Sequence, residues 1–115
     1  MLQVKLDQIR ASRTIQPTRT VIETPTFQKQ AEKVWTEAER LGFIDWIAAN
    51  PEAGDVIPGA DGARKVRWAR AGAGKSGGVR VIYFNLNERE VVLLVMLYAK
   101  SERGNVTTAE IEKVL

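Results

Sequence analysis

A run of nine consecutive apolar residues, Val91–Ala99, places the strongest constraint on the fold of this chain of 115 residues. The run is too short to cross a bilayer, because a spanning helix needs about 20 apolar residues. It is apolar at both odd and even positions, which is typical of a strand buried on both faces. We therefore expect residues 90–100 to form a central strand of a sheet.

Turn and cap signals divide the first half of the chain into short elements. Residues 20–23 are predicted to form a short strand. Thr24 and Pro25 are a typical helix start, with the threonine as N-cap and the proline in the first turn. Apolar residues then follow at helical spacing, namely Phe27, Ala31, Val34, Trp35, Ala38 and Leu41.

A second helix is predicted to follow the first directly. Thr36 and Glu39 form a capping box, so this helix begins at Thr36 and ends before Asn50–Pro51. The two helices are expected to pack as a hairpin, with Trp35 and Trp46 in the core.

The second half of the chain is predicted to form a hairpin sheet followed by a short helix. Its expected segments are a loop at 51–62, a strand at 63–70, a Gly-rich connection at 71–78, a strand at 79–86 and a turn at 87–89. Thr107 and Glu110 form another capping box, which opens a terminal helix with Ile111, Val114 and Leu115 directed inward. The order β-α-α-β-β-β-α indicates an α+β domain in which a helical hairpin packs on an antiparallel sheet.

Residues 1–19 are expected to be a poorly ordered appendage to a domain formed by residues 20–115. Leu2, Val4 and Leu6 alternate as in a strand, while Leu2, Leu6 and Ile9 also fit a helix, and Pro17 ends either element. The segment is too polar for a signal peptide. Together with the absence of cysteine, this favours a cytoplasmic protein.

The chain contains no histidine and no cysteine. This composition excludes a Ser-His-Asp triad, thiol chemistry, disulfides and histidine-ligated metals. Catalysis would have to use Lys, Arg, Tyr, carboxylates or backbone groups. Glu52 and Asp55 are better explained by turns or exposed ion pairs than by cation binding, so neither a metal nor a cofactor is expected.

Positive charge is concentrated in one segment. Residues 62–87 hold six basic residues and no acidic residue, although the net charge of the chain is only +3. These residues are Arg64, Lys65, Arg67, Arg70, Lys75 and Arg80. Ordinary solvated charges would explain them only with unfavourable self-repulsion, so we expect the segment to bind the phosphates of a nucleic acid.

Strand alternation sorts these residues onto faces. Lys65 and Arg67 share one face of the predicted strand, while Val66 and Trp68 point the other way, into the core. The two following strands add more polar side chains to the outer face. We predict a concave basic groove formed by Lys65, Arg67, Arg80, Tyr98 and Lys100.

The segment Gly72–Ser76 is similar to a nucleotide-binding P-loop but does not match it. Ala69 stands where that motif needs glycine, and the loop leads into a strand instead of a helix. We expect this loop to deliver Lys75 to an RNA phosphate, with Arg64 and Arg70 as further phosphate contacts.

Four segments together resemble the RelE/HigB-type toxins of bacterial type II toxin–antitoxin systems, which belong to the RelE/ParE superfamily. They are Asn50–Gly59, Arg64–Trp68, Gly74–Tyr83 and Tyr98–Lys100. The likeness extends from about Val21 to Leu115 and includes the order of the elements.

The resemblance implies a RelE-like fold and a metal-independent endoribonuclease of the cytoplasm. Such an mRNA interferase enters the A site of the 70S ribosome, cuts the mRNA there and so inhibits translation. The resemblance also implies a cognate antitoxin that holds the toxin inactive, binding to operator DNA only through this antitoxin, and no contact with a membrane.

The resemblance further assigns roles to individual residues. It implies that Lys65, Arg67, Arg80 and Lys100 are the basic residues of the catalytic site. Ser101 stands where better-known members carry an arginine. The C-terminal segment has no obvious tyrosine, so Tyr98 or Tyr83 would supply the aromatic hydroxyl.

Two other functions are compatible with the same residues. One is a non-catalytic RNA- or ribosome-binding module that blocks translation with the basic face. The other is a gyrase-targeting toxin of the same fold, for which a less prominent basic cluster is expected. The appearance of cleaved mRNA distinguishes the enzyme from both.

Overall fold

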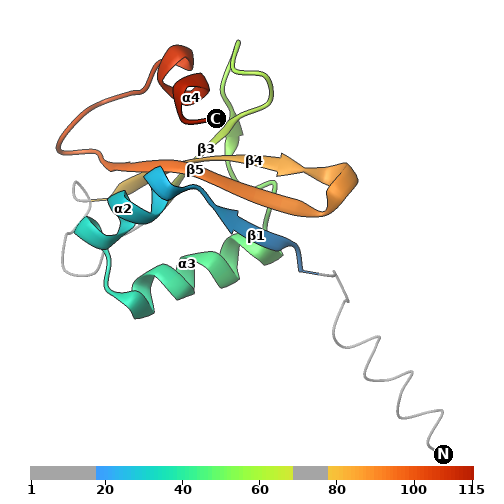
Figure 1. Ribbon diagram of the computed structural model, residues 1–115, viewed down its shortest axis with the longest axis horizontal. Coiled ribbons are helices and arrows are strands. Elements are labelled where there is room, and N and C mark those ends of the chain that lie inside the picture. The colour runs from blue at the N-terminus through green and yellow to red at the C-terminus, as the bar shows by residue number, and fades with distance from the viewer. Residues whose placement is uncertain (1–17, 69–77) are drawn as a thin grey trace, which may run out of the picture.

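The computed structural model describes residues 18–68 and 78–115 and has an α+β fold (Figure 1). Its elements are β1 (Thr20–Glu23), α2 (Pro25–Val34), α3 (Glu37–Ala49), β2 (Asp55–Val56), β3 (Arg64–Trp68), β4 (Val79–Leu86), a 3₁₀ turn (Asn87–Arg89), β5 (Val91–Ala99) and α4 (Thr108–Val114). The predicted fold class and element order are confirmed. The two-residue strand β2 is an addition, since it lies in a segment predicted to be a loop.

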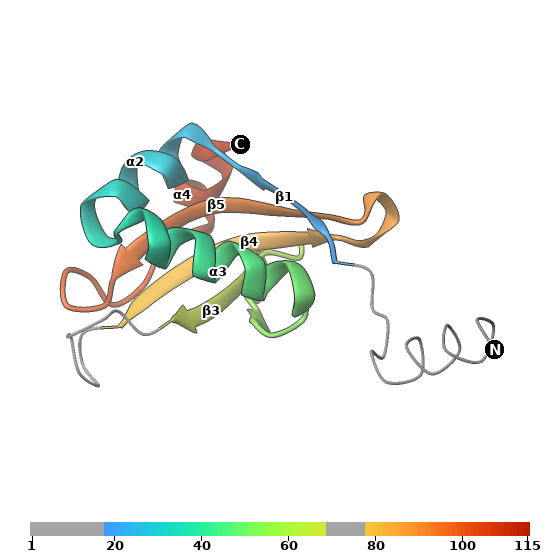
Figure 2. The same ribbon diagram turned by 90° about the horizontal axis from the view of Figure 1, so that it is seen from below.

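The strands form a single sheet in the order β1-β5-β4-β3-β2. Figure 2 shows β1, β5, β4 and β3 side by side in this order. β5 is an interior strand, as its apolar sequence predicts. It pairs antiparallel with β4, and β4 and β2 each pair antiparallel with β3, whereas β1 pairs parallel with β5. β3 is shorter than the predicted strand 63–70, whose last two residues lie outside the described part of the chain.

The helical hairpin has a sharp break between its two helices. Trp35 has an extended backbone, and Thr36 then starts α3 with the predicted capping box. The break changes the phase of the helical pattern. Leu41, which continues the apolar spacing of α2, is therefore 47% exposed. The residues that α3 buries are Phe43, Ile47 and Ala48.

A layer of protein covers each face of the sheet (Figure 1). α2 and α3 pack on one face around Phe27, Phe43 and Val66, with Trp46 and Trp68 half-buried at the margin of this cluster. The inward orientation predicted for Val66 and Trp68 is confirmed. We call this side the helix-hairpin face.

α4 and the loop between β2 and β3 pack on part of the opposite face, around Ile82, Met96 and Ile111. We call this side the α4 face. Ile111 is buried, as predicted, but Leu115 is 63% exposed, so its predicted inward orientation is wrong. Leu115 follows the last turn of α4, where no further helix holds its side chain against the sheet.

A β-bulge in β5 decides which side chains reach the α4 face. Ile82 is opposite Met96 and Tyr83 is opposite Leu94, so Val95 has no partner on β4. Val95 and Met96 consequently both join the cluster on the α4 face, and alternation is reversed beyond them. Tyr98 therefore lies on the α4 face, whereas uninterrupted alternation from Leu94 would direct it toward the helices.

Thr24 holds this bulge against the start of α2. Its N–H donates to the carbonyl oxygen of Leu94 at 3.0 Å, and its hydroxyl donates to the carbonyl oxygen of Val95 at 2.6 Å. The same hydroxyl oxygen accepts from the N–H of Phe27 at 3.0 Å, as an N-cap. One side chain thus fixes both a helix end and the extra residue of the strand.

We expect Thr24→Ala to be more destabilising than Thr36→Ala. Each change removes an N-cap, which costs about 1 kcal/mol. Only Thr24→Ala also leaves the bulge carbonyl of Val95 without its side-chain donor, at a further cost of about 1–3 kcal/mol. Urea unfolding measures both variants, and Thr24→Ser, which keeps the hydroxyl, serves as a control. Equal losses for the two alanine variants would show that the bulge contact contributes nothing.

Candidate functional site

Three polar side chains form a row across the α4 face of the sheet. Arg67 on β3 is directly opposite Arg80 on β4, and Arg80 is directly opposite Tyr98 on β5. Residues opposite each other in antiparallel strands project from the same face. The structure thus brings together three of the five residues predicted for the basic groove, and we call Arg67, Arg80 and Tyr98 the basic row.

The two predicted lysines lie at the margins of this row. Lys65 is two residues before Arg67 on the same face, in the neighbouring cross-strand position, opposite Ile82. Lys100 directly follows β5 and is exposed, and its N–H donates to the carbonyl oxygen of Gly78 at 3.1 Å. Gly78 itself directs its α-hydrogen toward the row, since a Cβ there would lie 3.8 Å from Arg67 Cγ and Arg80 Nη1.

An acidic residue also reaches this face. Asp55 on β2 is directly opposite Lys65 on β3, and its side chain is exposed. The sequence gave no indication of this neighbour, because a two-residue strand has no detectable alternation. The carboxylate lies at the β2 side of the groove, two strands away from the β4 arginine.

Two polar atoms in the row are buried without a hydrogen-bond partner among the described residues. They are Arg80 Nη1 and Tyr98 Oη. Burial raises the pKa of Tyr98 above its usual value, and the positive charges of Arg80 and Arg103 offset only part of this effect. Tyr98 therefore keeps its proton at neutral pH. The row places a guanidinium and a hydroxyl donor side by side, a combination that suits an anionic oxygen.

Arg103 and Glu110 cover Tyr98 from the C-terminal segment. The guanidinium carbon of Arg103 lies 5.5 Å from the centre of the Tyr98 ring. Its Nη atoms donate to the Glu110 carboxylate at 2.6 and 2.7 Å, and its Nε donates to the carbonyl oxygen of Asn105 at 2.9 Å. Sequence reasoning missed Arg103, because this residue lies outside the acid-free segment and its position depends on a tertiary contact with α4.

The second tyrosine considered, Tyr83, lies on the helix-hairpin face and is fully buried. Its hydroxyl donates to the carbonyl oxygen of Pro51 and accepts from the N–H of Gly54, both at 2.8 Å. Burial raises its pKa, and the Gly54 hydrogen bond acts in the opposite direction. Tyr83 fastens the loop before β2, and Tyr98 is the tyrosine that belongs to the basic row.

Of the remaining predicted phosphate contacts, only Arg64 lies among the described residues, and it is not part of the row. Arg64 lies on the same face of β3 as Val66, because the two residues are two positions apart. Its Nη1 donates to the carbonyl oxygens of Gly54 at 2.7 Å and Glu52 at 3.3 Å. It therefore supports the same loop as Tyr83. Arg70 and Lys75 lie outside the described residues.

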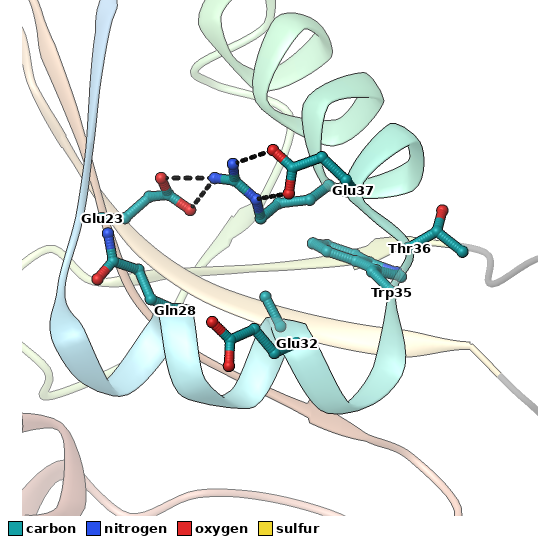
Figure 3. Close-up of a pocket in the computed structure, with 8 residues that line it drawn as sticks. Glu23, Gln28, Glu32, Trp35, Thr36 and Glu37 are labelled. Atoms are coloured by element: carbon teal, nitrogen blue, oxygen red, sulfur yellow. Dashed lines mark hydrogen bonds and ion pairs between the residues drawn. The ribbon is translucent and has the colours of Figure 1, made fainter.

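A separate pocket of about 430 Å³ lies between β1, α2 and α3 on the helix-hairpin side (Figure 3). Arg40 Nη1 contacts both carboxylate oxygens of Glu23 at 2.7 Å, and its Nη2 contacts Glu37 Oε1 at 2.7 Å. These bonds raise the pKa of Arg40 and lower that of Glu37. Arg40 bridges the two carboxylates, so this cluster ties β1 to the start of α3.

Within residues 18–68 and 78–115, no group of three or more carboxylates is placed to hold a metal ion. In the same part of the chain, no helix is both long and apolar enough to pass through a membrane.

Comparison with known proteins identifies the family. The sequence model of one protein family, described as the RelE toxin of the RelE/RelB toxin–antitoxin system, matches residues 20–115. The chain therefore belongs to the RelE toxin family of toxin–antitoxin systems, as the sequence resemblance predicts.

Solved structures of this fold agree with the family assignment. A double arginine-to-alanine mutant of the E. coli toxin RelE in the free state is 16% identical, with a TM-score of 0.55, and the match covers 84% of this chain and 93% of that chain. The isolated E. coli RelE toxin is 19% identical, with a TM-score of 0.52 and coverage of 84% and 99%. The toxin–antitoxin complex RelBE from Mycobacterium tuberculosis is 15% identical, with a TM-score of 0.51 and coverage of 79% and 98%. At these identities the likeness concerns the fold.

The Arg103–Glu110 pair makes a pH-dependent contribution to stability. Hydrogen bonds from Arg103 and from the N–H of Thr107 lower the pKa of Glu110 from 4.5 to about 2. The folded-state pKa is depressed, so this contribution is complete above the unfolded value and is lost as the pH falls toward about 2. Glu110→Gln should lower the melting temperature at pH 7, and the difference from wild type should shrink between pH 4.5 and 2. A difference that does not change over this range would contradict the assignment.

Proposed function

We propose that the chain is a ribosome-dependent mRNA endoribonuclease, an mRNA interferase that inhibits translation as the toxin of a toxin–antitoxin pair. The observation that supports this function most strongly is the basic row. Arg67, Arg80 and Tyr98 lie side by side on one face, and two of their buried polar atoms have no described protein partner. Membership of the RelE toxin family makes RNA the natural source of the anion that they would bind.

The proposed reaction is attack of a ribose 2′-oxygen on the adjacent phosphorus. The 2′-oxygen loses its proton, the 2′-O–P bond forms, and the P–O5′ bond breaks as the 5′-oxygen gains a proton. The products are a 2′,3′-cyclic phosphate and a 5′-hydroxyl. No electron acceptor or metal is needed for this balance, and the chain has no histidine to carry the protons.

The residues of the row divide these tasks by their chemistry. Arg67 and Arg80 stay charged and stabilise the extra negative charge on the phosphate. Tyr98, whose pKa is raised by burial, is the donor to the phosphate or to the leaving 5′-oxygen. Lys65 and Lys100 lie at the margins of the row, and we assign removal of the 2′-proton to one of them.

The ribosome supplies the orientation that this site lacks. The row contains no carboxylate–histidine or lysine–histidine pair that would hold a base in one position. Cleavage of free RNA should therefore be slow, whereas an A-site codon held in line would react faster, because orientation alone accounts for a large part of many catalytic effects. The predicted phosphate contacts of Arg70 and Lys75 are part of this proposal. We leave Arg64 out of it, because its guanidinium is engaged with the loop carbonyls.

A cognate antitoxin is the proposed regulatory partner. Arg67 is exposed and Arg80 is half-buried, and neither binds a carboxylate among the described residues, so the row is suited to an acidic segment of another protein. We propose that this antitoxin holds the toxin inactive in the cytoplasm and that operator DNA is bound only through it. Co-expression with the neighbouring small gene should restore growth.

We expect Arg67→Ala and Arg80→Met to reduce mRNA cleavage on the ribosome by about 10²–10³-fold, the usual effect of losing one well-placed donor to a transition-state charge. Methionine preserves most of the aliphatic length of Arg80, so the fold should survive. The measurement is single-turnover cleavage of a programmed ribosomal complex, with Lys65→Ala as a further test. Lys113→Ala, which removes a charge from exposed α4, is the matched control.

Retention of the wild-type cleavage rate in Arg80→Met would refute the catalytic assignment. Translation arrest without any cleaved mRNA would favour the non-catalytic ribosome-binding module instead. Arrest of supercoiling by purified protein would favour the gyrase-targeting alternative.

The two tyrosines should respond in opposite ways to removal of the hydroxyl. Tyr83→Phe leaves the N–H of Gly54 and the carbonyl of Pro51 without their partner and should cost about 1–3 kcal/mol of stability. Tyr98→Phe removes a hydroxyl that bonds to no described residue, so stability should stay equal or rise. Cleavage should fall in Tyr98→Phe and persist in folded Tyr83→Phe. Thermal melting together with the ribosomal cleavage assay measures both effects.

A further inference from the structure

A pocket of about 380 Å³ lies beside the basic row, at the edge of β5. β1 covers this edge only as far as Leu94. Beyond that residue α2 takes its place, and the pocket opens between α2, the second half of β5 and the turn that follows β5. Tyr98 belongs both to the basic row and to the lining of this pocket, so the two sites are continuous.

Gln30 on α2 presents a fixed amide in this pocket. Its Oε1 accepts from the N–H of Leu97 at 2.8 Å and so replaces the missing strand neighbour. This bond determines the orientation of the amide, and its NH₂ group has no acceptor among the described residues. Because this amide is already held in one orientation, it can recognise the edge of a nucleobase with little further loss of side-chain entropy.

Arg103 contributes a flat surface to the same pocket. The edge of its guanidinium is engaged by Glu110 and by the carbonyl oxygen of Asn105. The group lies with one face over the Tyr98 ring, so its other face and its two remaining N–H groups are left for a ligand. Guanidinium planes are regular stacking partners of unpaired RNA bases.

The rest of the lining combines polar and apolar groups. Lys33 and Glu102 are exposed, and neither forms an ion pair in the described part of the chain, so one supplies a donor and the other an acceptor. Val34 is half-buried and supplies apolar surface, whereas Leu97 lines the pocket but is almost fully buried. A phosphate would be repelled by Glu102 and would make no use of the apolar wall, whereas a base edge needs both donors and acceptors on an apolar support.

We propose that this pocket binds one unpaired nucleobase of the RNA, next to the phosphodiester that lies on the basic row. The pocket would then give the toxin a preference for one base near the cut. The identity of the ligand as RNA rests on the proposed function, but recognition of the base is a property of Gln30, Lys33 and Glu102 and does not require cleavage.

The test is a titration of the ¹⁵N-labelled full chain with four single-stranded RNA hexamers that differ only in one central base. We expect one hexamer to bind about tenfold more tightly than the others, as one base-edge contact allows. That hexamer should shift the side-chain NH₂ signals of Gln30. The double variant Lys33→Ala/Glu102→Ala should show a smaller preference, because Gln30 is then the remaining residue that reads the base. Lys29→Ala, a charge removal on the same helix outside the pocket, should keep the preference.

The possible failures are distinct. Equal binding of the four hexamers, with unmoved Gln30 signals, would overturn the base pocket and leave RNA binding intact. An undiminished preference in Lys33→Ala/Glu102→Ala would also overturn it, because neither charged side chain of the pocket would then take part in recognition. Absence of binding by every hexamer would count against both the pocket and the proposed function.

Discussion

The contact between Thr24 and the bulge of β5 connects the two halves of this molecule. Because of the bulge, side chains before and after Val95 alternate in opposite phase along β5. Leu94 faces the helices, whereas Tyr98, four residues later, faces away from them. An extra residue in an interior strand leaves a carbonyl group without a ladder partner, and Thr24 satisfies it from the cap of α2. The position of the helical hairpin and the composition of the opposite face are therefore coupled. If the bulge were absent, Tyr98 would point into the helix-side core and the two arginines would lack a tyrosine neighbour.

The α4 face of the sheet has an apolar part and a polar part. Near α4, Ile82, Met96 and Ile111 form an apolar cluster. One cross-strand position further along, Arg80 and Tyr98 bury polar atoms that have no hydrogen-bond partner among the described residues. Leaving such groups unpaired costs stability, and the adjoining apolar cluster is what offsets this cost. Arg103 marks the boundary, because it packs on the ring of Tyr98 while Glu110 ties it to α4.

Local signals were sufficient for most of the fold and for part of the site. Caps at Thr24, Thr36 and Thr107 located the helices, and alternation correctly separated Lys65 and Arg67 from Val66 and Trp68. The same alternation, applied one residue earlier, places Arg64 on the opposite face from Lys65. Residues whose position depends on distant partners could not be predicted. The bulge at Val95, the pairing of Asp55 with Lys65 and the Arg103–Glu110 pair each result from contacts that leave no local pattern in the sequence.

The parallel pairing of β1 with β5 affects the order in which the molecule can assemble. Thr24 and Val95 are separated by 71 positions, and β1 pairs with a strand that ends at Ala99. Contacts between segments so distant in sequence form late, because the loop between them must first be closed. During synthesis from the N-terminus, α2 and α3 can form early, but the first strand has no neighbour until β5 emerges. A nascent chain therefore carries Arg67 and Arg80 well before it can present them beside Tyr98, and the basic row is complete only once β5 has paired with β4.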